Sequence, residues 1–384
     1  MRVHRASHAT SIPRRRHRIW PWVVLILALL VVLLGVSGFF GLKLYSEAKQ
    51  VKAHGEQAMQ LTGGVTMLEK YAACAYAHFL SYGLHLKERK IYQVQAPDIG
   101  MIFHQAIERF SLRIGRSGYQ WRTIPDEIRD HLVEECVSSV VLEYNHSVMQ
   151  DSMRANYLTE KIMRMTKRTI WALQQQLKKG DFEPVGYEVR FTTELENQQM
   201  HLSYGDRGVM SLNGKIDRMD LCEEDDKVYL KIIDYKSGRT KFDLASVFHG
   251  LQLQLMVYMN AAREEQQQKK KQCIVIPAGI LYYHIDDPFV TSDNFRDFAG
   301  NQPVGPDEQN EDYSDASGAA EDALSILEQL AVDGLVLDDG DAVRHMDHHP
   351  EEPPKVLPVK IKKDGTLSAL SSAAAPENFE VLSW

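Results

Sequence analysis

The pattern of hydrophobic and polar positions between Gly214 and Tyr258 predicts a β-hairpin followed by a helix. An apolar run leads into a polar turn at residues 222–227, and a second apolar run ends in Asp234-Tyr235-Lys236. Beyond a short polar segment, apolar residues at spacings of three and four predict a helix from Ala245 onward. This stretch therefore predicts two neighbouring strands with charged residues near their ends, next to a helix.

The remaining pattern alternates between helical and strand-like periods, which predicts an α/β fold. Before the hairpin, helices are expected in residues 65–90, from Pro97 onward, and in residues 126–148 and 153–178, and strands in residues 185–193 and 202–210. After the hairpin, we expect a charged turn at 264–272, a strand at 273–285 broken by Pro277, an acidic loop at 297–322, a helix at 323–333, a strand pair about a turn at 363–365 and a helix from Pro376.

The N-terminal residues differ from the rest of the chain. Residues 1–18 are basic, and residues 19–42 run for 24 positions without a charge, with Trp20 and Trp22 at the near edge. At about 1.5 Å per residue such a helix crosses a hydrocarbon layer of about 30 Å. We expect a transmembrane helix with its N-terminus inside, because the run is long for a signal peptide. Residues 43–64 are then a polar linker.

Composition limits the remaining possibilities. With 384 residues, 44% hydrophobic and 25% charged, the chain can bury a full core. A net charge of −8 provides no general attraction for nucleic acid, although a local basic channel remains compatible with it. Four cysteines without a C-x-x-C pair favour reduced thiols over a zinc site or a disulfide framework. Residues 208–216 imitate a phosphate-binding loop with the wrong glycine spacing, so no ATPase is expected.

The hairpin brings three charged residues to one face. If the centre of the turn lies between Asp225 and Asp226, Asp217 faces Asp234, and Lys236 shares their face because side chains alternate along a strand. Paired carboxylates favour Mg²⁺ or Mn²⁺, and a lysine beside them can orient a water molecule. The alternative is a surface hairpin with an ordinary ion pair, but an unpaired charge in an apolar strand is costly.

The helix after the hairpin adds Gln252, Gln254 and Tyr258. Gln254 and Tyr258 are four residues apart and therefore share a helix face, from which an amide and a phenol could position a nucleic-acid backbone. The alternative is a helix that packs its apolar residues while these polar side chains face water.

These residues lie in segments that resemble a known family. IDR, IIDYKSG and GLQLQLMVY are similar to the RecB-type branch of the PD-(D/E)XK nucleases, and the chain more closely resembles the C-terminal nuclease region of the B subunit of AddAB-type helicase–nucleases. Further matching segments include LEKYAACAYAHFLSYGLHLKERK, APDIGMIFH and AGILYYHIDDPF. The resemblance covers residues 65–384 and implies a restriction-endonuclease-like fold, with a mixed central sheet flanked by helices.

The resemblance also implies roles for individual residues. His104, which on its own is more typical of a structural histidine, matches a metal ligand. Asp217 and Asp234 match the metal-binding carboxylates, with the main-chain carbonyl of Tyr235 as a further ligand, and Lys236 matches the catalytic lysine. Gln254 and Tyr258 match the family's Q-x-x-x-Y motif for substrate, with Gln252 beside it. Glu188, on a matching strand, is a further candidate.

Two features depart from the family pattern. The family holds an iron–sulfur cluster on four cysteines, of which Cys74 matches the first, but the sequence ends at Trp384 before the other three positions. We therefore expect no assembled cluster. The basic and apolar leader has no counterpart in the family, and a helicase-like N-terminal region is absent.

The function that the resemblance implies is a Mg²⁺- or Mn²⁺-dependent DNA exonuclease. It would cut by attack of metal-activated water on phosphodiesters and act in double-strand-break repair with an AddA-type helicase–nuclease subunit. The alternative is a non-catalytic membrane-anchored remnant, or a chimeric product, that retains the nuclease fold. The leader predicts a single-pass membrane protein, whereas the family predicts a cytoplasmic one, so the two expectations conflict.

Overall fold

The computed structural model describes most of the chain beyond residue 58. The described residues are 59–87, 89, 94–144, 153–191, 200–203, 208–238, 240–288, 315–362, 366–376 and 379. The larger of two compact units contains Leu61–Leu202 and Met210–Trp384.

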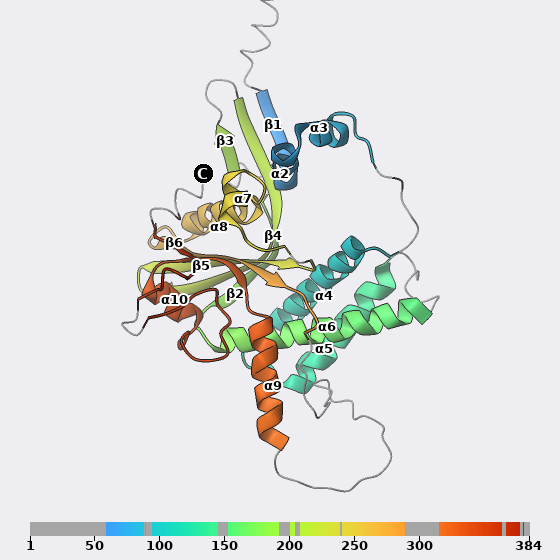
Figure 1. The fold of residues 1–384 in the computed structure, drawn as a ribbon, viewed down its shortest axis with the longest axis vertical. Helices are drawn as coiled ribbons and strands as arrows, with labels where there is room; N and C mark the ends of the chain where they lie inside the picture. The colour runs from blue at the N-terminus through green and yellow to red at the C-terminus, as the bar shows by residue number, and fades with distance from the viewer. Residues whose placement is uncertain are drawn as a thin grey trace, which may run out of the picture. The chain divides into compact units, whose positions relative to one another are not determined.

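Among these residues, eight strands form one mixed sheet (Figure 1). The strands are β1 (Met59–Gly64), β2 (Glu183–Phe191), β3 (Met200–Ser203), β4 (Gly208–Glu224), β5 (Lys227–Lys236), β6 (Ile274–His284), β7 (Asp333–Leu337) and β8 (Ala373–Ala374). The order is β1-β4-β5-β6-β7-β8, and β2 and β3 also pair with β4. Because β5 pairs antiparallel with β4 and parallel with β6, the sheet is mixed, as the family resemblance implied.

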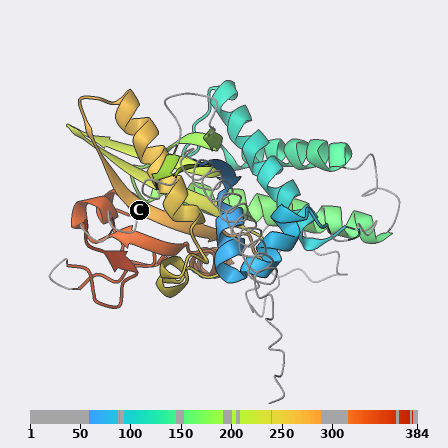
Figure 2. The same cartoon turned by 90° about the horizontal axis from the view of Figure 1, so that it is seen from above.

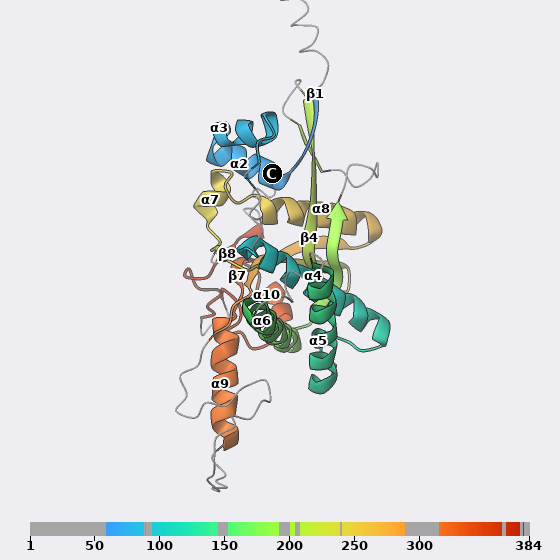
Figure 3. The same cartoon turned by 90° about the vertical axis from the view of Figure 1, so that its right-hand side faces the viewer.

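Helices cover both faces of this sheet. They are α2 (Val65–Ala73), α3 (Ala75–His78), the π-helical η1 (Phe79–Gly83), α4 (Ala96–Ser117), α5 (Asp126–Glu143), α6 (Met153–Lys178), α7 (Leu244–Phe248), α8 (Gln254–Lys269), α9 (Asp315–Gln329) and α10 (Gly340–Met346). On β4, Met219 contacts Gln266 of α8, whereas the next-door Arg218 lies over Trp121, in the turn after α4. Since adjacent strand residues face opposite ways, α8 and the α4–α6 bundle lie on opposite faces (Figures 2 and 3).

The hairpin of β4 and β5 has the predicted register. Arg218 pairs with Ile233 and Glu224 with Lys227, so the two-residue turn is Asp225-Asp226 and Asp217 stands opposite Asp234. Asp225 has φ 48°, a left-handed conformation that aspartate tolerates better than most residues. The prediction succeeded because hairpin register depends on a local turn.

The predicted helix from Ala245 is in fact two helices. Asp243 caps α7 through Ala245 N and Ser246 N, and Gly250 then adopts φ 75°. Such a conformation ends a helix, so α8 begins afresh at Gln254. The apolar spacing continued across this break and concealed it.

Three other boundaries differ from the prediction. Pro277 does not break β6, because a register shift opposite Leu230 and Lys231 absorbs the missing N–H. The charged residues up to Lys269 extend α8 rather than form a turn, since Gln266 is buried on its inner face. The strand β7 begins at Asp333, where the helix was expected to continue, and β1 occupies the end of the expected linker.

The predicted membrane topology is corrected by the structure. Within the described part of the chain, no helix is long and apolar enough to cross a bilayer. The segment 19–42, on which the prediction rested, lies outside the described residues. The prediction of a single-pass membrane protein is therefore not upheld.

Candidate active site

Three potential metal ligands meet where α4, β2 and β4 come together. His104 Nδ1 lies 3.3 Å from Asp217 Oδ2 and 3.6 Å from Glu188 Oε1. One donor atom from each of the three residues lies within 4.8 Å of the other two. The predicted His104 and Asp217 are thus together, and Glu188, the least expected candidate, completes the group.

The backbone of β2 is distorted at Glu188. Tyr187 pairs with Arg218 and Val189 with Ile216, so Glu188 stands opposite Asp217, with φ 51°. A non-glycine residue in this region is uncommon and marks local strain, which is frequent at functional sites. This conformation presents the Glu188 carboxylate to His104, and Lys215 forms an ion pair with its Oε2.

The hairpin places a second carboxylate and a lysine beside this group. Asp217 Oδ2 accepts a hydrogen bond from the backbone N–H of Tyr235 at 2.8 Å. Asp234 is 1% exposed, and its Oδ2 lies 2.6 Å from Lys236 Nζ. Lys236 Nζ also lies 5.1 Å from the ring centroid of Tyr282, a cation–π contact. Asp234 is not part of the 4.8 Å donor group, although its charge is close enough to act on both Asp217 and His104.

The electrostatics of the site follow from burial and crowding. Burial, and then the charge of Asp217, raise the pKa of Asp234 to about 7, although Lys236 opposes the shift. Burial alone would lower the pKa of His104, but its contacts with Asp217 and Glu188 outweigh burial and raise it to about 10. Without a metal, a protonated His104 therefore holds the carboxylates together, and a cation that binds there must displace that proton.

The donor set fits a divalent cation. Glu188 Oε2 and Asp234 Oδ2 are buried and have no hydrogen-bond partner, although both atoms contact lysines. Buried carboxylate oxygens without hydrogen bonds are costly, which favours a bound cation. Carboxylates suit Mg²⁺ and Mn²⁺, and one imidazole nitrogen is compatible with Mn²⁺. The Tyr235 carbonyl as a further ligand stays a prediction.

The start of α8 contacts the lysine directly. Gln254 Oε1 accepts a hydrogen bond from Lys236 Nζ at 2.7 Å, and Gln254 Nε2 donates to Tyr258 Oη at 3.0 Å. The predicted glutamine–tyrosine pair therefore forms. Gln252 instead accepts from Asp243 N and donates to Lys241 O, which commits its amide to the loop before α8.

A buried charge cluster lies on the opposite face of the same two strands. Arg218 donates to both carboxylate oxygens of Asp220, at 2.7 and 2.9 Å, and Lys231 Nζ lies 3.2 Å from Asp220 Oδ2. All three side chains are buried, and the Arg218 guanidinium and the Lys231 ammonium rest against Trp121 and Phe182. This cluster ties β4 to β5 next to Asp217 and Asp234.

The cysteines are free thiols that do not gather. Cys74 is exposed and its Sγ accepts from Ala77 N, whereas Cys136 and Cys222 are buried in α5 and β4. The prediction that Cys74 is the first cluster ligand stays a prediction.

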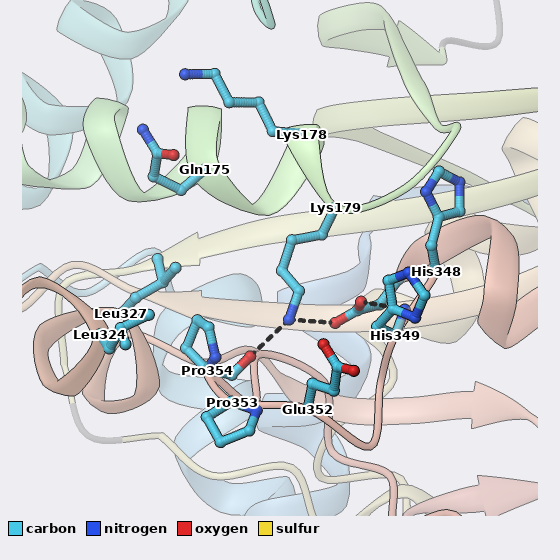
Figure 4. A pocket seen from close by; sticks show the side chains of 11 residues that line it. Gln175, Lys178, Lys179, Leu324, Leu327, His348, His349, Glu352, Pro353 and Pro354 are labelled. Atoms are coloured by element: carbon cyan, nitrogen blue, oxygen red, sulfur yellow. Dashed lines mark hydrogen bonds and ion pairs between the residues drawn. The ribbon is translucent and has the colours of Figure 1, made fainter. Parts of the chain in front are cut away.

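A pocket of ≈ 350 Å³ lies at the far end of α6 (Figure 4). Its basic residue Lys179 is engaged by Asp347 Oδ2 and Pro354 O, each at 2.8 Å. The exposed side chains His349, Glu351 and Glu352 form a second metal-capable group beside it. None of the residues of the His104 group lines this pocket.

Comparison with known proteins decides what this arrangement belongs to. The sequence pattern of the PD-(D/E)XK nuclease superfamily matches residues 64–349. The chain belongs to this superfamily. In PD-(D/E)XK terms, Asp217 provides the first acidic position of the motif, and Asp234-Tyr235-Lys236 provides the (D/E)XK part.

Several relatives of this superfamily member carry the same name, the B subunit of an ATP-dependent helicase/deoxyribonuclease. The chain is 38% identical over 331 residues to the protein of this name from Lachnoclostridium phytofermentans, a match that covers 86% of this chain and 26% of the relative. The proteins of the same name from Alkaliphilus oremlandii and Clostridium acetobutylicum are each 34% identical, over 90% and 85% of this chain and 28% and 27% of the relatives. The chain thus spans about a quarter of the length of these relatives.

Two residues near the site had no place in the sequence prediction. Lys215 is two residues before Asp217 on the same strand, so strand periodicity could have placed it on that face. Glu69 hydrogen-bonds the backbone of Leu253 and Gln254, which follow it by 184 and 185 positions, and nothing in the local sequence signals such a contact.

Proposed function

We propose that this chain is a divalent-metal-dependent deoxyribonuclease domain that hydrolyses phosphodiester bonds in DNA. The observation that carries the proposal is the His104–Glu188–Asp217 donor group beside the Asp234–Lys236 pair. Membership of the nuclease superfamily and the names of the relatives support DNA as the substrate.

His104, Glu188 and Asp217 would hold the cation, with Asp234 as a further candidate ligand, and Mg²⁺ or Mn²⁺ are the expected ions. A bound divalent cation supplies Lewis-acid stabilisation of the negative charge on a phosphate. The protein contributes orientation: Tyr235 N fixes one oxygen of Asp217, and the strained conformation of Glu188 keeps its carboxylate beside His104.

Lys236 is the group that we expect to act on the reacting atoms. Its ammonium has three donors, and Asp234 and Gln254 contact it at 2.6 and 2.7 Å. A remaining N–H can donate to a water molecule or to a phosphate oxygen, where its positive charge stabilises the transition state. Tyr258 orients the Gln254 amide through their hydrogen bond and so belongs to the same unit.

Assembly with an AddA-type subunit and a role in double-strand-break repair are further parts of this proposal. Their support is the resemblance to the relatives named above, of which the chain spans about a quarter. The cleavage polarity and exonuclease mode expected from the family stay predictions.

The test is cleavage of a labelled single-stranded oligonucleotide by the full chain with Mg²⁺ or Mn²⁺. Lys236→Gln should lose at least about 100-fold in rate, because it removes the charge that acts in the transition state. Lys178→Gln, on an exposed site at the end of α6, is the matched control and should keep the wild-type rate. A K236Q rate equal to that of K178Q, or cleavage unaffected by a chelator, would contradict the proposal.

A wild-type chain that binds Mn²⁺ but cleaves nothing would favour the non-catalytic alternative. The two measurements, binding and cleavage, therefore separate a retained metal site from a working nuclease.

A further inference from the structure

The start of α8 is capped by a residue from the other end of the chain. Glu69, on α2, accepts hydrogen bonds at Oε1 from Leu253 N at 2.7 Å and Gln254 N at 3.0 Å. The N-cap residue of α8 is Leu253, which has no side-chain acceptor for these amides. Glu69 therefore satisfies N–H groups that the helix leaves unpaired, and its negative charge suits the helix N-terminus.

The capped residue is the one that contacts the candidate catalytic lysine. Gln254 N binds Glu69, Gln254 Oε1 accepts from Lys236 Nζ at 2.7 Å, and Gln254 Nε2 donates to Tyr258 Oη. The backbone and both ends of the side-chain amide of Gln254 are thus fixed. A change at Glu69 passes to Lys236 through a single residue.

Glu69 is also electrostatically suited to this place. It is partly buried, and burial raises the pKa of its carboxyl, while the two backbone N–H groups and the charge of Lys236 oppose that rise. The carboxylate thus lies within the electrostatic reach of Lys236 without contacting the His104 donor group.

We propose that Glu69 is a positioning residue for the nuclease reaction: by capping α8, it sets the place of Gln254 and through it the orientation of the Lys236 ammonium. This inference rests on the proposed function of the same site. It adds α2, about 150 residues before the hairpin, to the parts of the chain that determine the reaction geometry.

A merely structural cap would have a different signature, and the chain offers a matched control for it. Asp339 caps α10 by accepting from Asp341 N at 2.8 Å and Ala342 N at 3.4 Å. The last turn of α10 places His345 against Tyr229, near the start of β5, whereas Lys236 ends that strand. Asp339→Ala therefore removes a helix cap of the same kind, away from the candidate site.

The experiment compares Glu69→Ala, Glu69→Gln and Asp339→Ala in the full chain. Single-stranded DNA cleavage with Mg²⁺ gives kcat and KM, and NMR amide exchange reports on Leu253 and Gln254. In E69A we expect about tenfold lower kcat with little change in KM, because displaced catalytic groups slow the chemical step. The two amides should exchange faster in E69A.

In E69Q the amide oxygen can still accept both hydrogen bonds, so kcat should lie within about twofold of wild type and both amides should stay protected. D339A should keep the wild-type kcat. Wild-type kcat in E69A would overturn the inference, as would equal losses in E69A and E69Q, or a loss in D339A as large as in E69A.

Failure of the inference and failure of the proposed function are distinguishable. A wild-type chain without metal-dependent cleavage refutes the proposed function. Amide exchange is measured independently of activity, and unchanged exchange at Leu253 and Gln254 in E69A would overturn the cap whatever the activity.

Discussion

Asp220→Asn tests whether the buried charge cluster maintains the hairpin that carries the candidate site. The wild-type cluster places one carboxylate between two cations, and Asp220 is 0% exposed while Arg218 is 1% and Lys231 8% exposed. The substitution keeps the shape of the side chain but leaves two buried cations without a counter-charge. Breaking a buried ion pair from one side typically costs about 3–5 kcal/mol of unfolding free energy.

Lys231→Met provides the internal comparison. It removes the more exposed cation and leaves the bidentate Arg218–Asp220 pair, which is neutral as a pair. Burial also lowers the pKa of Lys231, so its charged form is already disfavoured. We expect K231M to change the unfolding free energy by no more than about 1 kcal/mol, in either direction.

Urea unfolding followed by tryptophan fluorescence measures both variants. Trp121 lies 5.5 Å from the Arg218 guanidinium and so reports on this region. The reasoning predicts a large loss in D220N and a small change in K231M at pH 7. Equal effects, or a D220N loss below about 1 kcal/mol, would show that the cluster does not hold β4 and β5 as described.

Two further predictions concern the far end of the sheet. Burial alone would lower the pKa of His345, but Asp181 and Glu224 raise it, so its charged form stabilises the fold fully below the unfolded pKa of about 6.5 and the effect fades as pH rises through the folded pKa. His345→Ala should thus cost on the order of 1 kcal/mol at pH 6, reduced by solvent screening, and less at pH 9 by urea unfolding; a pH-independent cost would contradict this. Gly180→Ala would place a Cβ 2.3 Å from the carbonyl oxygens of His345 and Met346 and should cost about 1–3 kcal/mol, whereas Gly115→Ala meets nothing within 4 Å and should be neutral or stabilising; equal melting temperatures would refute the contact.

The sequence predicts the parts of the site that depend on local structure. Turn position and strand alternation put Asp217 opposite Asp234 and Lys236 on the same face, and helix periodicity paired Gln254 with Tyr258. Each inference uses neighbours within one hairpin or one helix turn.

Long-range contacts were beyond such reasoning. The approach of His104 to Asp217 came from the family resemblance, because α4 and β4 are joined by tertiary packing alone. The role of Glu188 depends on its unusual φ, which no alternation of apolar residues reveals. Glu69 and Gln254 meet across 185 positions for the same reason. Periodicity also failed at Gly250, where one left-handed residue divides α7 from α8.

The central claim is that His104, Glu188 and Asp217 hold one divalent cation, and its most direct test is a calorimetric Mn²⁺ titration of the full chain at pH 7. Because the pKa of His104 is raised to about 10, binding should release about one proton, seen as a dependence of the heat on buffer ionisation. Asp217→Asn should weaken binding at least about 100-fold, because it removes a ligand charge. Glu351→Gln, in the exposed second group, should bind like wild type. Mn²⁺ binding in D217N that matches wild type would contradict the account.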